Sequence, residues 1–169
     1  MTLCARDIMV REIDTIDPNA SVEDAIYKIS NGVVRDTGYK TVSLMVVDGM
    51  QRLCGVVTMF DLLYHLRPDY LNFGIDSRQL KWEGQLDLLI GNVRGKRVHQ
   101  IMTCNVVSVS ADDHIMVLLD RMVKKKYRRL PVLDCGKLVG VVYLSDVYHH
   151  LLVCHTEHRL MPRMAGACH

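Results

Sequence analysis

Two aspartates close the same short sequence pattern and are the strongest candidates for binding chemistry in this chain. Gly55-Val56-Val57 precedes Asp61 with the spacing at which Gly140-Val141-Val142 precedes Asp146. A strand that runs into a helix places such an aspartate at the helix start, where its carboxylate can accept hydrogen bonds from a ribose diol. Hydroxyls and free backbone amides at the same helix end suit phosphate oxygens. An aspartate there is also an ordinary helix-capping residue, so ligand binding is one of two interpretations.

Both patterns belong to a longer internal repeat. Ile8-Met9 recurs as Ile101-Met102, 93 residues later, whereas the glycine–valine–aspartate pattern recurs 85 residues later. The difference, 93 − 85 = 8, makes the first copy eight residues longer, mostly around residues 31–38, which predict an enlarged loop. Residue types that recur in the same order over this length indicate a duplication.

Each copy predicts the element order β-α-β-β-α. A short strand and a polar turn lead into an amphipathic helix, and Ser21 with Asp24 forms a capping-box pattern at the first of these helices. Two strands joined by a hairpin turn follow, and each copy closes with a helix that begins at its aspartate. The expected strands are 13–16, 44–47 and 53–57 in the first copy, and 106–109, 130–133 and 138–143 in the second.

Hydroxyl-bearing residues accompany both aspartates, but in different positions. In the first copy Thr58 supplies a hydroxyl to Asp61. In the second copy Ser145 supplies one to Asp146, and Tyr143 stands where the first copy has Thr58. Both sets combine a diol acceptor with a phosphate donor, which is the equipment for a nucleotide.

Basic residues separate the copies more sharply. Arg128 and Arg129 lie before the second copy's middle strand, and Val42 and Ser43 hold the matching positions in the first copy. An arginine fork binds phosphate oxygens through charge-assisted hydrogen bonds. The second copy is therefore predicted to dominate nucleotide binding, and the first to take a less charged ligand or none. The lysines of the run 124–129 are interpreted as a solvated helix end rather than a nucleic-acid site.

The repeat resembles the CBS domain, and two copies in tandem resemble a Bateman module over residues 4–153. The string Arg129-Leu130-Pro131-Val132-Leu133-Asp134, followed by Leu138-Val139-Gly140-Val141-Val142, carries this resemblance most specifically. It implies an α/β (α+β) fold of two β-α-β-β-α repeats packed with pseudo-two-fold symmetry. It also implies a regulatory module that binds AMP, ADP, ATP or S-adenosylmethionine in clefts between the repeats, with no catalysis of its own.

The resemblance also assigns the ligand contacts. In the family each cleft takes backbone and apolar contacts from the other copy's entry strand, which would bring Met9, Val10 and Ile13 to one adenine and Met102, Thr103 and Val106 to the other. Ribose and phosphate contacts are expected from Thr58, Asp61, Arg128, Arg129, Ser145 and Asp146.

The expected domain division follows the repeat. Residues 1–66 form the first repeat and 98–153 the second, and 154–169 form a tail. Residues 67–97 link the repeats and contain a short helix, which Leu80, Leu86, Leu89 and Ile90 indicate and Gly84 weakens. Apolar residues on more than one side of the closing helices predict a two-fold homodimer; they are Leu62, Leu63, Leu66, Val147, Leu151 and Leu152.

Composition excludes several classes of protein. The chain has 169 residues, of which 49% are hydrophobic and 24% charged, so disorder is excluded. A net charge of +2 argues against a dedicated nucleic-acid binder. No run approaches the length of a membrane span. Six cysteines without a Cys-x-x-Cys pair favour free thiols and a cytoplasmic location.

Catalysis and metal binding have no candidate residues. The sequence contains no nucleophile–base pair, P-loop or His-Glu-x-x-His motif, so we predict no enzyme activity and no cofactor beyond the regulatory nucleotide. Histidines and cysteines gather near the C-terminus at spacings that match no zinc module, and we predict no metal site. Methionines in apolar patterns are expected in the core; they are Met9, Met45, Met59, Met102, Met116 and Met122.

A second class of function stays open at this point. The missing basic residues of the first copy and Tyr143 in the second are also compatible with an interaction or dimerisation module that has no physiological nucleotide. Either module would act on an effector protein as partner, and neither requires a nucleic acid or a membrane.

Overall fold

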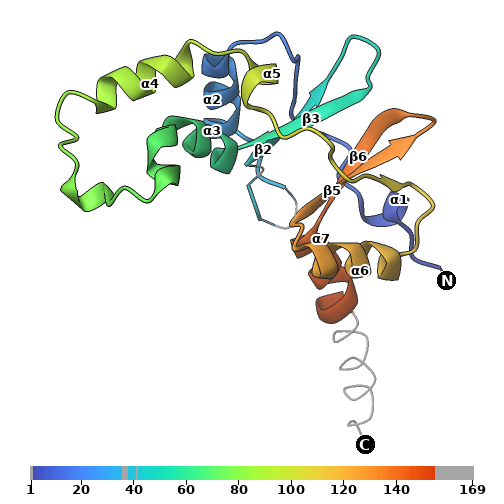
Figure 1. The fold of residues 1–169 in the computed structure, drawn as a ribbon. Helices are drawn as coiled ribbons and strands as arrows, with labels where there is room; N and C mark the ends of the chain where they lie inside the picture. The colour runs from blue at the N-terminus through green and yellow to red at the C-terminus, as the bar shows by residue number, and fades with distance from the viewer. Residues whose placement is uncertain (1, 36–37, 41, 155–169) are drawn as a thin grey trace, which may run out of the picture. The chain divides into compact units, whose positions relative to one another are not determined.

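The structure is a computed structural model that describes residues 2–35, 38–40 and 42–154. Within it the chain forms two compact units. The Asp61 unit comprises residues 14–106, and the Asp146 unit joins the residues up to Ile13 to those from Val107 onward. Each unit contains one three-stranded sheet with helices against it, which confirms the predicted mixed α/β class (Figure 1).

The Asp61 unit has the strand order β1-β2-β3. Strand β1 is parallel to β2, and β2 and β3 form an antiparallel hairpin. The strands are β1 (Thr15–Ile16), β2 (Ser43–Val47) and β3 (Leu53–Thr58). The helices are α2 (Val22–Ser30), α3 (Met59–Leu66), α4 (Leu86–Arg94) and α5 (Val98–Ile101), with short 3₁₀ turns η1 (Asp69–Phe73) and η2 (Ser77–Gln79).

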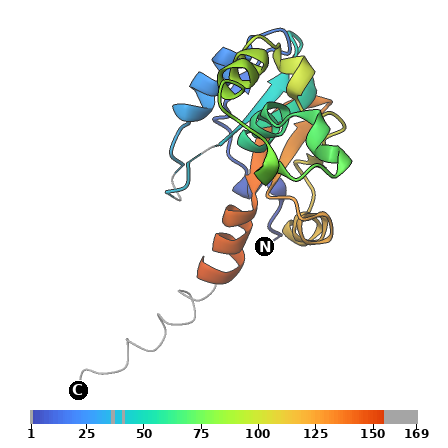
Figure 2. The ribbon, with the colours of Figure 1, turned by 60° about the vertical axis from the view of Figure 1, so that its left-hand side comes forward.

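The Asp146 unit repeats this arrangement. Its sheet has the order β4-β5-β6, again with one parallel and one antiparallel pair. The strands are β4 (Val109–Ser110), β5 (Arg129–Asp134) and β6 (Lys137–Tyr143), and the helices are α1 (Ala5–Ile8), α6 (Ile115–Lys125) and α7 (Leu144–Tyr148). Helix α7 continues into the π-helical turn η3 (His149–Val153) as one rod (Figure 2).

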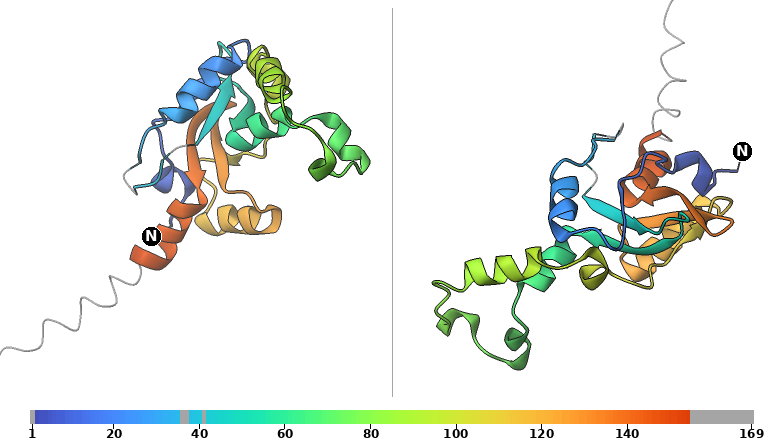
Figure 3. Two further views of the ribbon diagram at one scale, coloured as in Figure 1. Left: turned by 90° about the vertical axis from the view of Figure 1, so that its left-hand side faces the viewer. Right: turned by 90° about the horizontal axis from the view of Figure 1, so that it is seen from above.

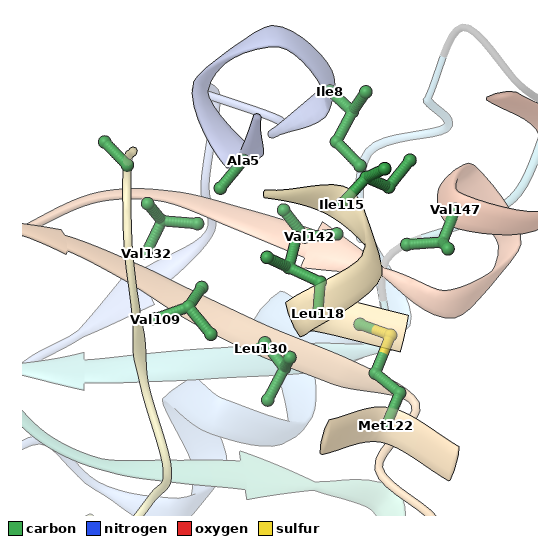
Figure 4. Close-up of a cluster of buried hydrophobic side chains, with 11 residues drawn as sticks. Ala5, Ile8, Val109, Ile115, Leu118, Met122, Leu130, Val132, Val142 and Val147 are labelled. Carbon is green, nitrogen blue, oxygen red and sulfur yellow. The ribbon is translucent and has the colours of Figure 1, made fainter. Parts of the chain in front are cut away.

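Each unit has its own hydrophobic core, built from the periodic apolar residues of its helices and the inner face of its sheet. In the Asp146 unit the core side chains of α6 meet those of β5 and β6 (Figure 4). Each fully buried aliphatic side chain contributes about 1.5–3 kcal/mol to such a core. The core of the Asp61 unit is formed by Ile16, Val22, Ala25, Ile29, Leu44, Val46, Val57, Val93, Val98 and Ile101.

The first amphipathic helix begins as the sequence predicts. The Ser21 Oγ accepts a hydrogen bond of 3.1 Å from the Asp24 backbone amide and donates one of 2.8 Å to the Asp24 carboxylate. A cap of this kind stabilises a helix by about 1 kcal/mol. It fixes the start of α2, so that Val22, Ala25 and Ile29 face the core.

Each unit includes a short arm from the segment that precedes the other copy. We call residues 4–10 the first arm and residues 97–103 the second arm. The first arm joins the Asp146 unit, where the Ala5 amide donates to the Asp113 carbonyl at 2.9 Å. The second arm joins the Asp61 unit, where the Val98 amide donates to the Ala20 carbonyl at 3.0 Å. The two donors, Ala5 and Val98, are 93 residues apart, and so are the two acceptors, Ala20 and Asp113. The duplication therefore extends to this hydrogen bond.

Both arms cross their unit's last strand at a glycine. A two-way backbone pair joins Val10 to Val141, and an equivalent pair joins Thr103 to Val56. The preceding methionine lies over the glycine before that valine. A Cβ atom built on Gly140 would meet the Met9 Sδ at 2.5 Å. Only a residue without a side chain allows this approach.

The shortest predicted strands differ from the structure in length. Residues 13–16 were expected to pair, but β1 contains Thr15 and Ile16, and the expected strand 106–109 reduces to Val109 and Ser110. The residues before each short strand connect it to the arm, and the Asp14 carbonyl still accepts a hydrogen bond of 3.1 Å from the Met45 amide of β2. The alternating apolar residues therefore predicted an extended segment that is longer than the strand found in the structure.

The segment between α3 and α4 leaves the sheet as an excursion (Figure 3). The predicted linker helix is α4, which begins after Gly84 and excludes Leu80. Gly84 has a φ of +76°, a left-handed conformation that ends regular structure ahead of the helix. The enlarged loop of the first copy corresponds to residues 31–42, between α2 and β2, where the second copy uses residues 126–128 between α6 and β5.

Several apolar predictions for individual side chains are wrong. Met59 and Met116 are about half exposed rather than buried, because they lie on the outward faces of α3 and α6. Val147 lies in the core of the Asp146 unit and is not available for an interface. Leu63 and Leu152 are exposed, as a role at an interface requires. Among the described residues no helix is long and apolar enough to cross a membrane.

The glycine contact at the second arm generates a stability prediction. A Cβ atom on Gly55 would lie 2.7 Å from the Thr103 carbonyl oxygen and 2.9 Å from the Met102 Sδ. Because a backbone atom blocks it, Gly55→Ala should lower the free energy of unfolding by about 1–3 kcal/mol. Chemical denaturation measures this, with Gly49→Ala as the control, since that Cβ would enter open space. Equal stability of the two variants would contradict the close packing of the second arm.

Candidate functional site

The Asp61 carboxylate is held at the junction of β3 and α3. Asp61 is the third residue of the helix, and Thr58 is the N-cap. The Asp61 Oδ2 accepts hydrogen bonds from the Thr58 backbone amide at 2.7 Å and from the Thr58 Oγ1 at 2.8 Å. In return the Asp61 amide donates to the Thr58 Oγ1 at 3.3 Å. The aspartate therefore closes a capping box from inside the first turn, rather than starting the helix as the sequence pattern suggested.

The second arm adds a third donor to this carboxylate. The Thr103 Oγ1 donates to the Asp61 Oδ1 at 2.7 Å, across 42 residues of chain. Asp61 is buried, whereas the Thr103 side chain is exposed. Both residues are expected ligand contacts from the family resemblance, but no sequence pattern indicates that they bind each other. The repeated Ile-Met pair aligns Thr103 with Val10 and does not predict the bond to Asp61.

Ser43 lies beside this group on the neighbouring strand. It pairs directly with Thr58 in the register of β2 and β3, and directly opposed side chains lie on the same face of a sheet. Ser43 is buried at 3% exposure, and its Oγ has no hydrogen-bond partner among the described residues. A buried hydroxyl without a partner costs about 1–3 kcal/mol, so a ligand hydroxyl or a water is the natural partner. Together Ser43, Thr58, Asp61 and Thr103 form a cluster of three hydroxyls and one carboxylate.

The Asp146 group has the same backbone frame with different side chains. Asp146 is buried at 3% exposure and is again the third residue of its helix, α7. The Ser145 Oγ lies 3.5 Å from the Asp146 Oδ1, a long contact. The N-cap is Tyr143, whose side chain makes no capping hydrogen bond. Val10 holds the arm position that Thr103 holds in the Asp61 unit, and it brings no hydroxyl.

Arginines take the place of Ser43 in this unit. Arg129 pairs with Tyr143 in the register of β5 and β6, as Ser43 pairs with Thr58. Arg129 is half-buried and Arg128 is exposed, and the Arg128 carbonyl accepts a hydrogen bond of 2.9 Å from the Leu144 amide at the start of α7. Both arginines therefore lie at the start of β5, next to the beginning of the helix that contains Asp146.

The expected contact residues fall into two complete sets, one in each unit. Met102, Thr103 and Val106 belong to the unit of Thr58 and Asp61. The other unit contains Met9, Val10, Ile13, Arg128, Arg129, Ser145 and Asp146. Each aspartate thus has, in its own unit, the arm residues that the family resemblance associates with a ligand.

Metal binding finds no support in the described part of the chain. No group of three or more histidine, cysteine, aspartate or glutamate side chains is placed there to hold a metal ion. Most of the histidine- and cysteine-containing tail, residues 155–169, lies outside the described residues.

Comparison with known families matches both units to one domain type. The model of the CBS domain family matches residues 5–68 and 98–153. The chain belongs to the CBS domain family. It is a CBS pair, and the resemblance seen in the sequence is confirmed.

Similar proteins are known from Arabidopsis thaliana. The chain is 29% identical over 150 residues to the CBS domain-containing protein CBSX2, chloroplastic, and the match covers 81% of this chain and 58% of the relative. A crystal structure of CBSX2, described as a CBS-pair protein, has a TM-score of 0.68 and 26% identity, covering 92% of this chain and 99% of that one. A crystal structure of CBSX2 in complex with AMP has a TM-score of 0.66 and 26% identity, covering 90% and 98%.

Proposed function

We propose that this chain is a regulatory CBS pair that senses adenosine-containing nucleotides and has no catalytic activity of its own. The observation that carries the proposal is the Asp61 cluster, a buried carboxylate surrounded by hydroxyls, one of which has no partner among the described residues. Such a group suits a ribose, because a diol needs carboxylate acceptors and offers an oxygen to an orphan hydroxyl. The complex of the similar CBSX2 with AMP supports the same ligand class.

The two units divide the chemistry of a nucleotide between them. Thr58, Asp61, Met102, Thr103 and Val106 make up a site rich in hydroxyls and without an arginine at the Ser43 position. The other site adds Arg128 and Arg129 to Ser145 and Asp146, with Met9, Val10 and Ile13 from the first arm. We therefore assign AMP, ADP or ATP to the Asp146 unit first, and a less charged adenosine ligand such as S-adenosylmethionine to the Asp61 unit.

Thermal stability tests the ligand class directly. Unfolding temperature is measured for the chain alone and with adenosine, AMP, ADP, ATP or S-adenosylmethionine, with guanosine monophosphate as the base control. A ligand at a hundred times its Kd stabilises the folded protein by about 2.7 kcal/mol, an easily measured shift. We expect a shift with at least one adenosine compound and none with the guanosine control. If every compound leaves the transition in place, the chain is an interaction module without a nucleotide.

The arginines should confer phosphate dependence. Arg128→Gln or Arg129→Gln should weaken AMP and ATP but leave adenosine unchanged, because adenosine has no phosphate to lose. Removing one hydrogen bond to a charged group costs about 1.5–3 kcal/mol, equivalent to at least tenfold in Kd. Calorimetric titration measures the losses, with Lys125→Gln, on the exposed end of α6, as the matched charge control. Equal losses for adenosine and AMP would contradict the assignment.

A homodimer is the second part of the proposal, and the outward face of α3 supports it. Met59, Phe60, Leu63 and Tyr64 are all at least half exposed on this helix, and the rings of Phe60 and Tyr64 stack at 6.3 Å. Exposed apolar patches of this kind mark interfaces, and two-fold dimers are the commonest oligomers. The same face supports the alternative of an interaction module whose partner is an effector protein. The cytoplasmic location stays a prediction.

Polar substitution on α3 tests the dimer. Phe60→Ser with Leu63→Ser should convert a dimer of about twice the 19.3 kDa chain mass into a monomer. Both side chains are mostly exposed, at 74% and 64%, so the fold itself should change little. Light scattering gives the mass, and Val123→Ser on α6 is the control at a comparably exposed apolar position. A wild-type protein that is already monomeric at micromolar concentration, or a variant that stays dimeric, would contradict this interface.

A further inference from the structure

The hydrogen bonds of Asp61 leave fewer acceptor sites than a ribose diol needs. A carboxylate offers about four lone-pair sites, two on each oxygen. The Thr58 amide and hydroxyl fill both sites of Oδ2, and the Thr103 hydroxyl fills one site of Oδ1. One site remains, whereas the 2′ and 3′ hydroxyls of a ribose together donate two hydrogen bonds. A diol that binds Asp61 through both hydroxyls must therefore displace one protein donor.

The two protein donors differ in how firmly they are held. Displacing Thr58 would break the capping box and free the start of α3, at a cost of about the stability of a helix cap. Displacing the Thr103 hydroxyl would break a single bond of an exposed side chain, which can turn to water instead. Thr103 is therefore the weaker competitor and the one that a diol replaces.

We infer that Thr103 competes with the ligand for Asp61. A ribose diol that binds Asp61 displaces the Thr103 hydroxyl and so breaks the side-chain hydrogen bond between the second arm and Asp61. This inference rests on the proposed function, because it requires an adenosine ligand at Asp61. It makes Thr103 a positioning residue that sets affinity, rather than one of the ligand contacts expected from the family resemblance. In the Asp146 unit Val10 stands at the matching position of the first arm and brings no hydroxyl.

The released residue lies close to where the chain leaves the unit. After Thr103, three residues remain before Val107, the first residue of the Asp146 unit. In the absence of ligand the arm near Thr103 is held by the backbone pair with Val56, by Met102 over Gly55 and by the bond to Asp61. Loss of the last contact weakens the arm where it begins its passage to the other unit. Ligand binding at Asp61 thereby changes how firmly the chain that leads to the other unit is held.

The sign of one affinity change tests the inference. Thr103→Val keeps the shape of the side chain and removes the competing hydroxyl, so adenosine should bind the Asp61 unit about three- to tenfold more tightly. The gain should vanish for 2′-deoxyadenosine, because its remaining secondary ribose hydroxyl fits the one free acceptor site. Kd values come from NMR titration of the residue 103 and Val56 amides, which report on this unit alone. Thr103→Ser should match the wild type, and Val123→Thr, at an exposed position of α6, should leave these values unchanged.

Amide exchange without ligand gives a second, independent measurement. The residue 103 and Val56 amides, which are hydrogen-bonded to each other's carbonyls, should exchange faster in Thr103→Val than in the wild type. If the wild type binds adenosine in the Asp61 unit and Thr103→Val binds it there equally or more weakly, the competition is overturned while the proposed function stands. If no protein binds any adenosine compound, the proposed function fails and the competition fails with it. Unchanged exchange of the two amides would overturn the role of Thr103 in holding the arm.

Discussion

The close crossing of an arm over a glycine is the constraint on which each unit depends. At Gly140 and at Gly55 the strand backbone admits a methionine side chain at a distance that any Cβ atom would block. The residue after each methionine then forms a two-way backbone pair with the following valine. These contacts join segments far apart in the sequence, so each sheet is completed by a part of the chain that precedes the opposite copy. The repeat in the sequence and the compact unit in the structure are consequently different pieces of chain.

Duplicated backbone contacts carry different side chains in the two units. The hydrogen bond from each arm into its unit recurs at an offset of 93 residues, whereas the crossing glycine and the aspartate in the first helical turn recur at an offset of 85. The side chains on this common frame have diverged, from a threonine to a tyrosine at the N-cap and from a serine to an arginine on the neighbouring strand. Packing fixes the frame, because a change at a crossing glycine disturbs a whole unit. The polar positions are not constrained by this close packing, so the same fold can carry different polar side chains in its two units.

The sequence was sufficient for the β-α-β-β-α order of each copy, because helical and strand periodicity are local properties, but it did not predict the short arm helices α1 and α5. The Ser21 N-cap and the hairpin strands follow directly from neighbouring residues. Local pattern was insufficient where pairing or exposure depends on distant segments. Strand β1 begins at Thr15 rather than at residue 13, and the Asp14 carbonyl just before it accepts a hydrogen bond from the Met45 amide of β2. Met59 faces outward although it fits the apolar pattern. At the site, the resemblance placed Thr103 near a ligand, but its bond to Asp61 depends on a crossing 42 residues away.

A ligand can shift the state of a protein only if it prefers one state of some element over another. The cores of the two units are poor candidates for that element, since they are close-packed and large parts of them would have to open together. The second arm near Thr103 is a better one, because a backbone pair, one methionine and one hydroxyl hold it there. One of these contacts ends on the carboxylate that a ribose would use. The second arm is thus hydrogen-bonded directly to the carboxylate proposed to bind the ribose, and the proposed coupling requires no longer pathway through the core.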